Sequence, residues 1–216
     1  METQKLREGI FLLKNALTES DVQVLLGLYV SHKEDLYKPK LKNGYSMSLD
    51  MFCMGHHWDA TDYKYKATRA DYDNKPVPTS LGPLNEIAAR YLSVCFPEYA
   101  PDWDICLMNY YNGTSKLGYH QDNSESKETL KSGHPVVSFS IGAGCIFRVG
   151  GLKRKDPMDT VLLEHGDVLM FGGPSRLIFH GVDSLVVQRD SLLNRDEAPL
   201  AKELNHGRLN FTLRKM

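Results

Sequence analysis

Arg208-Leu209-Asn210-Phe211-Thr212-Leu213-Arg214 closes the chain with a strict alternation of polar and apolar side chains. Side chains two positions apart share one face of a β-strand, so we predict a strand with the apolar side chains in packing. The opposite face would carry Arg208, Asn210, Thr212 and Arg214. Two guanidinium groups on one inner face are suited to holding a dianion.

Three possible metal ligands precede this strand. His120-Gln121-Asp122 comes first, and His180 follows 58 residues after Asp122. Two histidines and one carboxylate form the facial triad that binds Fe(II) and leaves positions open for a cosubstrate and O₂. Each piece alone has a plainer interpretation, as a chance tripeptide, a turn at a strand end or a solvated arginine face. Their order and spacing favour one shared site.

Short strand-like segments fill the chain from residue 105 onward and alternate with turns. Their regular spacing predicts a β-sandwich or jelly roll. The expected strands are 105–111, 136–141, 145–149, 161–163, 168–171 and 177–179, and a strand is also expected within 8–17. Thr18 is expected to cap a helix over 22–29, a second helix is expected over 81–96, and 183–206 reads as a long loop.

Bulk composition narrows the class of protein. A chain of 216 residues with a net charge of −1 has no global attraction to nucleic acid, so any such binding must use local patches. Four scattered cysteines indicate a reduced, intracellular protein. The charged first residues do not resemble a signal peptide, and the apolar stretch 135–147 is too short to span a membrane. We expect a monomer in the cytoplasm, or in the nucleus of a eukaryote.

The segment 38–76 differs from the rest because it is polar and rich in Lys and Tyr. Positions 36 to 69 contain six basic residues and three acidic ones (Asp50, Asp59 and Asp62). This local excess of positive charge suits binding to a phosphate backbone. The alternative is that Trp58 packs in a core and the lysines solvate a loop. His56 and His57 are expected to be loop residues, because nothing nearby completes a metal site.

The chain resembles the AlkB-type Fe(II)/2-oxoglutarate dioxygenases, which dealkylate nucleic acids, and within them the bacterial alkylation-repair branch. The resemblance covers nearly the whole chain and is carried by Met108–Tyr111, Leu117–Asp122, Val137–Gly142, Phe147–Arg154, Leu163–Val168, Gly172–Arg176, His180-Gly181 and Arg208–Arg214. It implies a mainly β fold with flanking helices, a double-stranded β-helix (jelly roll). The single domain would span 1–216, with a nucleotide-recognition lid at 38–76 and a jelly-roll core at 105–216.

The resemblance also assigns roles to residues. His120, Asp122 and His180 would bind the iron and form the catalytic centre. Arg208 would pair with the distal carboxylate of 2-oxoglutarate, and Arg214 would lie near its C1 carboxylate. The other cosubstrate residues would be Asn109, Tyr111 and Asn210, although the residue pattern alone would place Asn109 and Tyr111 at a solvent-facing strand end.

Substrate contacts follow from the same resemblance. Trp58 would stack on an extruded base, since stacking contributes about 1–3 kcal/mol per base, and Tyr65 would contact the backbone. Ser124 stands where the bacterial enzymes place an Asp that contacts the base. The remaining substrate residues would be Met47 and Ser48 at the start of the lid, Glu125 beside Ser124, and Arg154.

The implied activity is oxidative demethylation of 1-methyladenine and 3-methylcytosine in DNA, with RNA left open. Fe(II), 2-oxoglutarate and O₂ would be required, and formaldehyde would be released. The alternatives are a tRNA base demethylase and a catalytically silent jelly roll that binds nucleic acid. The gap from His180 to Arg208 is 28 residues, about a dozen more than in the bacterial pattern.

Overall fold

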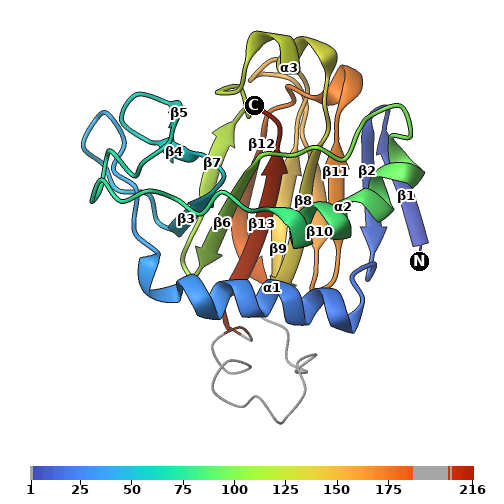
Figure 1. Ribbon diagram of the computed structural model, residues 1–216. Helices are drawn as coiled ribbons and strands as arrows, with labels where there is room; N and C mark the ends of the chain where they lie inside the picture. The colour runs from blue at the N-terminus through green and yellow to red at the C-terminus, as the bar shows by residue number, and fades with distance from the viewer. Residues whose placement is uncertain (1, 187–203, 205) are drawn as a thin grey trace.

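Two antiparallel sheets packed face to face form the body of the protein (Figure 1). The computed structural model describes residues 2–186, 204 and 206–216. The larger sheet has the order β1-β2-β11-β8-β13-β6-β3. Its strands are β1 (Glu2–Arg7), β2 (Ile10–Lys14), β3 (Asp50–Met54), β6 (Ile105–Tyr111), β8 (Val136–Gly142), β11 (Val168–Phe171) and β13 (Arg208–Arg214).

The smaller sheet covers one face of the larger sheet and has the order β10-β9-β12-β7. Its strands are β7 (Leu117–His120), β9 (Gly144–Val149), β10 (Asp159–Leu163) and β12 (His180–Val186). A separate hairpin consists of β4 (His57–Asp59) and β5 (Lys64–Lys66). The mainly β jelly roll expected from the sequence is confirmed.

The alternation along β13 separates two environments. Leu209, Phe211 and Leu213 pack into the apolar cluster beneath the helices, on the outer face of the larger sheet. Arg208 and the other polar side chains of β13 face the space between the two sheets. Every residue of β13 is buried, so its polar face lies inside the protein and can only be satisfied by partners there.

Two helices cover the outer face of the larger sheet (Figure 1): α1 (Glu19–His32) and α2 (Gly82–Cys95). Thr18 caps α1 as predicted. Its side chain accepts from the backbone N–H of Asp21, whose carboxylate accepts in return from the backbone N–H of Thr18. This reciprocal capping box satisfies two N–H groups that the first turn would leave without partners. The short elements are α3 (Lys127–Ser132), η1 (Lys33–Asp35) and η2 (Gly173–Ser175).

Two expectations about the polypeptide path were wrong. Residues 177–179 form a turn and coil after η2, because strand pairing begins only at His180, opposite His120 and Val149. Residues 183–186 belong to β12 and not to a loop. Most of the expected loop, 187–203 and 205, lies outside the described residues.

Part of the segment expected to form a lid, 38–76, belongs to the larger sheet. Residues 50–54 form β3, which pairs with β6 at the edge of the larger sheet. The larger sheet therefore takes β1, β2 and β3 from before residue 105 and is not confined to 105–216. This strand was not predicted from the sequence because Lys-rich segments flank it. The last four residues of the strand are all buried. No helix among the described residues is long and apolar enough to cross a membrane, and all four cysteines are buried and free.

Candidate active site

The three expected metal ligands meet at the mouth of the space between the sheets. His120 ends β7 and His180 begins β12, and the antiparallel pairing of these strands places the two histidines opposite each other. Asp122 follows β7 by two residues. Its carboxylate oxygens lie 3.4 Å from His120 Nε2 and 3.7 Å from His180 Nε2, and one ligand atom from each residue lies within 4.8 Å of the others.

The hydrogen bonds of the histidines leave the correct atoms for a metal. His120 Nδ1 lies 2.8 Å from the Gly118 carbonyl, and His180 Nδ1 lies 3.1 Å from the Ile178 carbonyl. With Nδ1 as the donor in each ring, the lone pair of Nε2 is available to a metal. Asp122 Oδ2 is buried and has no hydrogen-bond partner among the described residues. These three residues therefore fit a divalent iron ion.

Electrostatics keep His180 and Asp122 in their metal-binding protonation states. Burial, together with the neighbouring His120, lowers the pKa of His180 to about 4, so the imidazole is neutral near pH 7. Burial alone would raise the pKa of Asp122, but Arg214 and the two histidines outweigh burial and hold it well below its usual range. Arg214 Nη2 lies 2.5 Å from Asp122 Oδ1.

The inner face of β13 continues from the triad into the sandwich as a cradle of donors. Arg208 is 1% exposed, and one guanidinium N–H donates to Ser140 Oγ at 2.9 Å. Its Nε and Nη1 are buried without a partner among the described residues. A buried cation with two donor atoms that have no partner is suited to binding a carboxylate. The cradle therefore fits the distal carboxylate of 2-oxoglutarate.

The other expected cosubstrate residues line the same space. Asn109 and Tyr111 are buried on the inner face of β6, so the solvent-facing alternative for this pair is wrong. Asn210 donates to Ser138 Oγ at 2.7 Å. Arg214 lies beside the triad, but its ion pair with Asp122 already occupies part of its guanidinium.

An open cavity of about 790 Å³ is lined by His120 and Asp122 of the triad. The substrate residues expected from the sequence that line it are Met47, Ser48, Trp58, Ser124 and Arg154. Trp58 is half-buried, and its indole N–H donates to Ser124 Oγ at 3.1 Å. Trp58 therefore forms part of the cavity wall, and its buried part packs against the apolar cluster between the sheets.

Tyr65 and Glu125 do not line this cavity, in contrast to the expected substrate contacts. The Glu125 side chain is fully buried between Arg176 and Arg214. The Tyr65 hydroxyl accepts from Arg214 at 2.9 Å and lies 3.3 Å from Glu125. The polar atoms of both residues are already engaged by neighbouring charged side chains. Both residues therefore support the cavity from beneath.

Sequence reasoning assigned no role to Arg176. Its guanidinium is 2% exposed, donates to the backbone carbonyl of Asp122 at 2.7 Å and lies 3.3 Å from Glu125. Arg176 thus fixes the backbone of a metal ligand. The available signal was its place at the end of the Gly172–Arg176 motif, four residues before His180.

The basic excess in the hairpin region is smaller than the sequence count suggested. Lys66 pairs with Asp59 and Asp62, and Lys38 lies near Asp50. Arg69 is buried and paired with Asp73, which lies beyond the counted window. Of the six basic residues, only Lys40, Lys42 and Lys64 lack an ion pair within the described part of the chain.

Comparison with known proteins agrees with this geometry. Residues 9–214 match the model of the 2OG-Fe(II) oxygenase superfamily. The chain is 34% identical to the DNA N(6)-methyladenine demethylase ALKBH1C of Arabidopsis thaliana, over 97% of the chain and 49% of the relative. It is 40% identical to the AlkB dioxygenase of Escherichia coli, over 66% of the chain and 64% of the relative.

A solved structure gives the same result. That of OsALKBH1 superposes with a TM-score of 0.81 at 34% identity, and the match covers 100% of both chains. The chain belongs to the superfamily of 2-oxoglutarate- and Fe(II)-dependent oxygenases, and within it to the AlkB family. The similarity is not specific to the bacterial branch, because the plant alignments cover more of the chain. The chain spans about half the length of the curated plant relatives it matches.

Proposed function

We propose that this chain demethylates N-methylated bases in nucleic acid by Fe(II)- and 2-oxoglutarate-dependent oxidation. The observation that carries this proposal is the juxtaposition of three elements. A metal triad with available Nε2 atoms lies between a buried arginine cradle and a cavity with a tryptophan wall. Because His120 and Asp122 line this cavity, a substrate group inside it can approach the metal, which suits a base extruded from a strand.

His120, Asp122 and His180 would hold Fe(II), and Arg208 would hold the far carboxylate of 2-oxoglutarate. Bound iron would supply the oxidation of an N-methyl group by O₂, with one oxygen atom going to the methyl carbon and the other to 2-oxoglutarate, which would become succinate and CO₂. The hydroxymethyl product would then break down to formaldehyde and the unmodified base. The contribution of the protein is placement, since a correctly oriented reactant removes much of the entropic barrier.

The walls of the cavity divide the placement of the base among different residues. Trp58 offers a flat face to the base, and its indole N–H donates to Ser124 Oγ at 3.1 Å. Met47 and Met51 make part of the wall apolar and so exclude water around the methyl group. Arg154 lies at the same cavity and donates to the Tyr119 carbonyl at 2.9 Å, which leaves its other N–H groups for a phosphate.

The charge of the cavity bears on which base it takes. 1-Methyladenine and 3-methylcytosine carry a positive charge near neutral pH, whereas N6-methyladenine is neutral. The cavity wall includes Lys116, Arg154 and Arg214, while the one carboxylate among its described residues, Asp122, is paired with Arg214. Ser124 is uncharged, and Glu125 lies outside the cavity lining. This balance favours a neutral methylated base, and the name of the Arabidopsis relative points to the same class.

The second candidate substrate class is the cationic pair expected from the sequence, 1-methyladenine and 3-methylcytosine. It is favoured by the 40% identity to the Escherichia coli dioxygenase across the part of the chain that aligns. RNA bases remain within the same class of reaction, because nothing in the described wall selects a deoxyribose.

The test is a panel of matched DNA and RNA oligonucleotides, each with one N6-methyladenine, 1-methyladenine or 3-methylcytosine. Formaldehyde and succinate are measured together. We expect equal amounts of both products, with N6-methyladenine turned over faster than the cationic bases. His120→Ala is the inactive control. Binding of methylated strands without succinate release would instead identify a silent nucleic-acid-binding jelly roll.

A further inference from the structure

In β4 the polar side chains are more deeply buried than the apolar one, which is the reverse of the pattern that hydrophobicity favours. His57 is 0% exposed and Asp59 is 1% exposed, while Trp58 between them is half-buried at the cavity. Burying polar side chains costs free energy unless each finds partners. We therefore look for the partners that His57 and Asp59 find inside the protein and for the segments that these partners connect.

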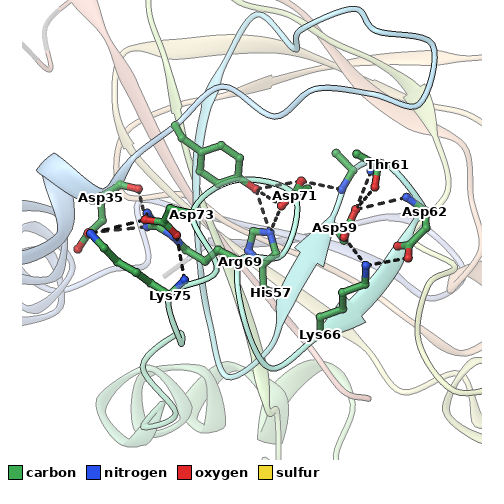
Figure 2. A network of polar contacts seen from close by, with 12 residues as sticks. Asp35, His57, Asp59, Thr61, Asp62, Lys66, Arg69, Asp71, Asp73 and Lys75 are labelled. Atoms are coloured by element: carbon green, nitrogen blue, oxygen red, sulfur yellow. Dashed lines mark hydrogen bonds and ion pairs between the residues drawn. The ribbon is translucent and has the colours of Figure 1, made fainter.

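His57 and Asp71 form the centre of a buried polar cluster (Figure 2). His57 Nε2 lies 2.6 Å from a carboxylate oxygen of Asp71 and 3.0 Å from the Tyr37 hydroxyl. The other oxygen of Asp71 accepts from the backbone N–H of Ala60 at 3.1 Å. One carboxylate thus holds both the side chain of β4 and the backbone just after it.

The cluster joins the hairpin to the larger sheet. Tyr37 exchanges two backbone hydrogen bonds with Met51 of β3, at 3.2 and 2.8 Å. The Tyr37 ring stacks on Tyr72 with centroids 4.4 Å apart. Tyr72 and Asp71 belong to a compact turn that Arg69 closes through its ion pair with Asp73. Three chain segments remote in sequence therefore meet at His57.

A second set of contacts stabilises the tip of the hairpin on the same inner face. Asp59 accepts from the backbone N–H and the hydroxyl of Thr61, at 2.8 and 2.6 Å, and pairs with Lys66 of β5 (Figure 2). Since His57 and Asp59 flank Trp58, both neighbours of the wall residue are anchored. Alternation along β4 then directs Trp58 to the opposite face, toward the cavity.

We propose that His57 and Asp71 are positioning residues that hold the β4–β5 hairpin as a preformed wall and so fix the plane of Trp58 above the metal. This inference rests on the proposed function for its kinetic consequence but not for its structural one. A preformed wall removes the cost of ordering the hairpin when a base binds. The hairpin would then not act as the mobile lid expected from the sequence.

Asp71→Asn tests the structural part without any substrate. The change keeps the size of the side chain but replaces a charge-assisted hydrogen bond with a neutral one. The chain has two tryptophans, and Trp103 is buried elsewhere, where its indole N–H donates to the Pro135 carbonyl at 2.8 Å. With 5-fluorotryptophan incorporated, ¹⁹F NMR reports both positions separately, and Trp58→Phe assigns the signals.

We expect Asp71→Asn to shift or broaden the Trp58 resonance and to leave the Trp103 resonance unchanged. Asp62→Asn is the matched control, because Asp62 is an exposed acid on the same hairpin that pairs with Lys66. It should leave both resonances in place. An unchanged Trp58 signal in Asp71→Asn would overturn the proposal.

The kinetic part uses the best methylated oligonucleotide of the wild-type protein. Replacing a charge-assisted hydrogen bond with a neutral one corresponds to about a tenfold rise in KM. We expect that rise in Asp71→Asn with less than a twofold change in kcat, and an unchanged rate of 2-oxoglutarate consumption without nucleic acid. If KM, kcat and the rate of 2-oxoglutarate consumption without nucleic acid all worsened by the same factor, the role of Asp71 would be generally structural and the positioning role would be contradicted.

Two milder variants keep the proposal testable if Asp71→Asn does not fold. Tyr37→Phe removes only the hydroxyl that contacts His57, and His57→Gln keeps a polar group. Both should move the Trp58 signal and KM in the same direction, and wild-type values in both would refute the proposal. If the wild-type protein turns over no methylated oligonucleotide, the proposed function fails, while the ¹⁹F measurement still decides the positioning role.

Discussion

Replacement of Arg208 by Met should remove most of the affinity for 2-oxoglutarate while leaving the unliganded fold intact. The guanidinium is buried, and within the described structure two of its nitrogen atoms, Nε and Nη1, have no partner. A hydrogen bond to a charged group contributes roughly 1.5–3 kcal/mol. Loss of that amount raises Kd by about ten- to 150-fold.

The same structure predicts the effect on thermal stability. At a 2-oxoglutarate concentration of about 100 times Kd, binding stabilises the native state by about 2.7 kcal/mol, which raises Tm by roughly 5–11 °C in a chain of this size. If Kd of Arg208→Met is about 50-fold higher, the same concentration is about twice Kd. The stabilisation is then about 0.7 kcal/mol, or roughly 1–3 °C.

Differential scanning fluorimetry without O₂, with Mn(II) in place of iron, measures these shifts without turnover. The unliganded variant should melt at or above the temperature of the wild-type protein, because an unpaired buried cation has been removed. Arg148→Met is the matched control, since Arg148 pairs with Asp183 on the smaller sheet, away from the cradle. A wild-type Tm shift in Arg208→Met would show that another residue binds the far carboxylate.

Four further predictions address other parts of the site. His120→Ala should abolish iron binding in an anaerobic Fe(II) titration, and retained stoichiometry would remove His120 from the ligand set. Glu125→Gln should lower the free energy of unfolding in urea by about 3–5 kcal/mol, because it leaves buried arginine charge uncompensated; a loss under 1 kcal/mol would contradict this. Burial opposes the charge on Asp59, but its ion pair and hydrogen bonds prevail and lower its pKa from 3.8 to about 2. About 2 kcal/mol of stability should therefore be present above pH 4 and be lost between pH 4 and 2, a loss absent from Asp59→Asn. Lys64→Ala should reduce the salt dependence of oligonucleotide binding, and Lys66→Ala should change it little because Lys66 is already paired; equal effects would refute the distinction.

The metal triad was predictable from its His-x-Asp…His spacing and from the family resemblance, and the polar face of β13 was predictable because that strand alternates regularly. The 3.6-residue pattern over 81–96 gave α2 nearly in full, whereas the cap at Thr18 gave the start of α1 and the expected range 22–29 covered only its middle. Local periodicity determines which face a side chain takes, so Arg208 and Asn210 were assigned correctly to one interior surface. The triad needed only the further fact that β7 and β12 pair.

Residues whose role depends on distant partners could not be assigned in this way. His57 looked like a loop residue because Asp71 and Tyr37, which bury it, lie 14 and 20 positions away. Lys66 counted as a free positive charge because an ion pair cannot be read from composition. Glu125 looked available to a base, and only its two arginine partners place it beneath the cavity.

The hairpin is held at two points, and these differ in their relation to the metal. At β4, His57 ties the hairpin to the edge of the larger sheet. At β5, Tyr65 accepts a hydrogen bond from Arg214, which is also ion-paired with Asp122. One guanidinium therefore joins the support of the substrate wall to a metal ligand. Because Arg214 is buried, any movement of Tyr65 would leave one of its donors unsatisfied at a free-energy cost. A rigid wall and a correctly oriented ligand are thus properties of one connected set of contacts.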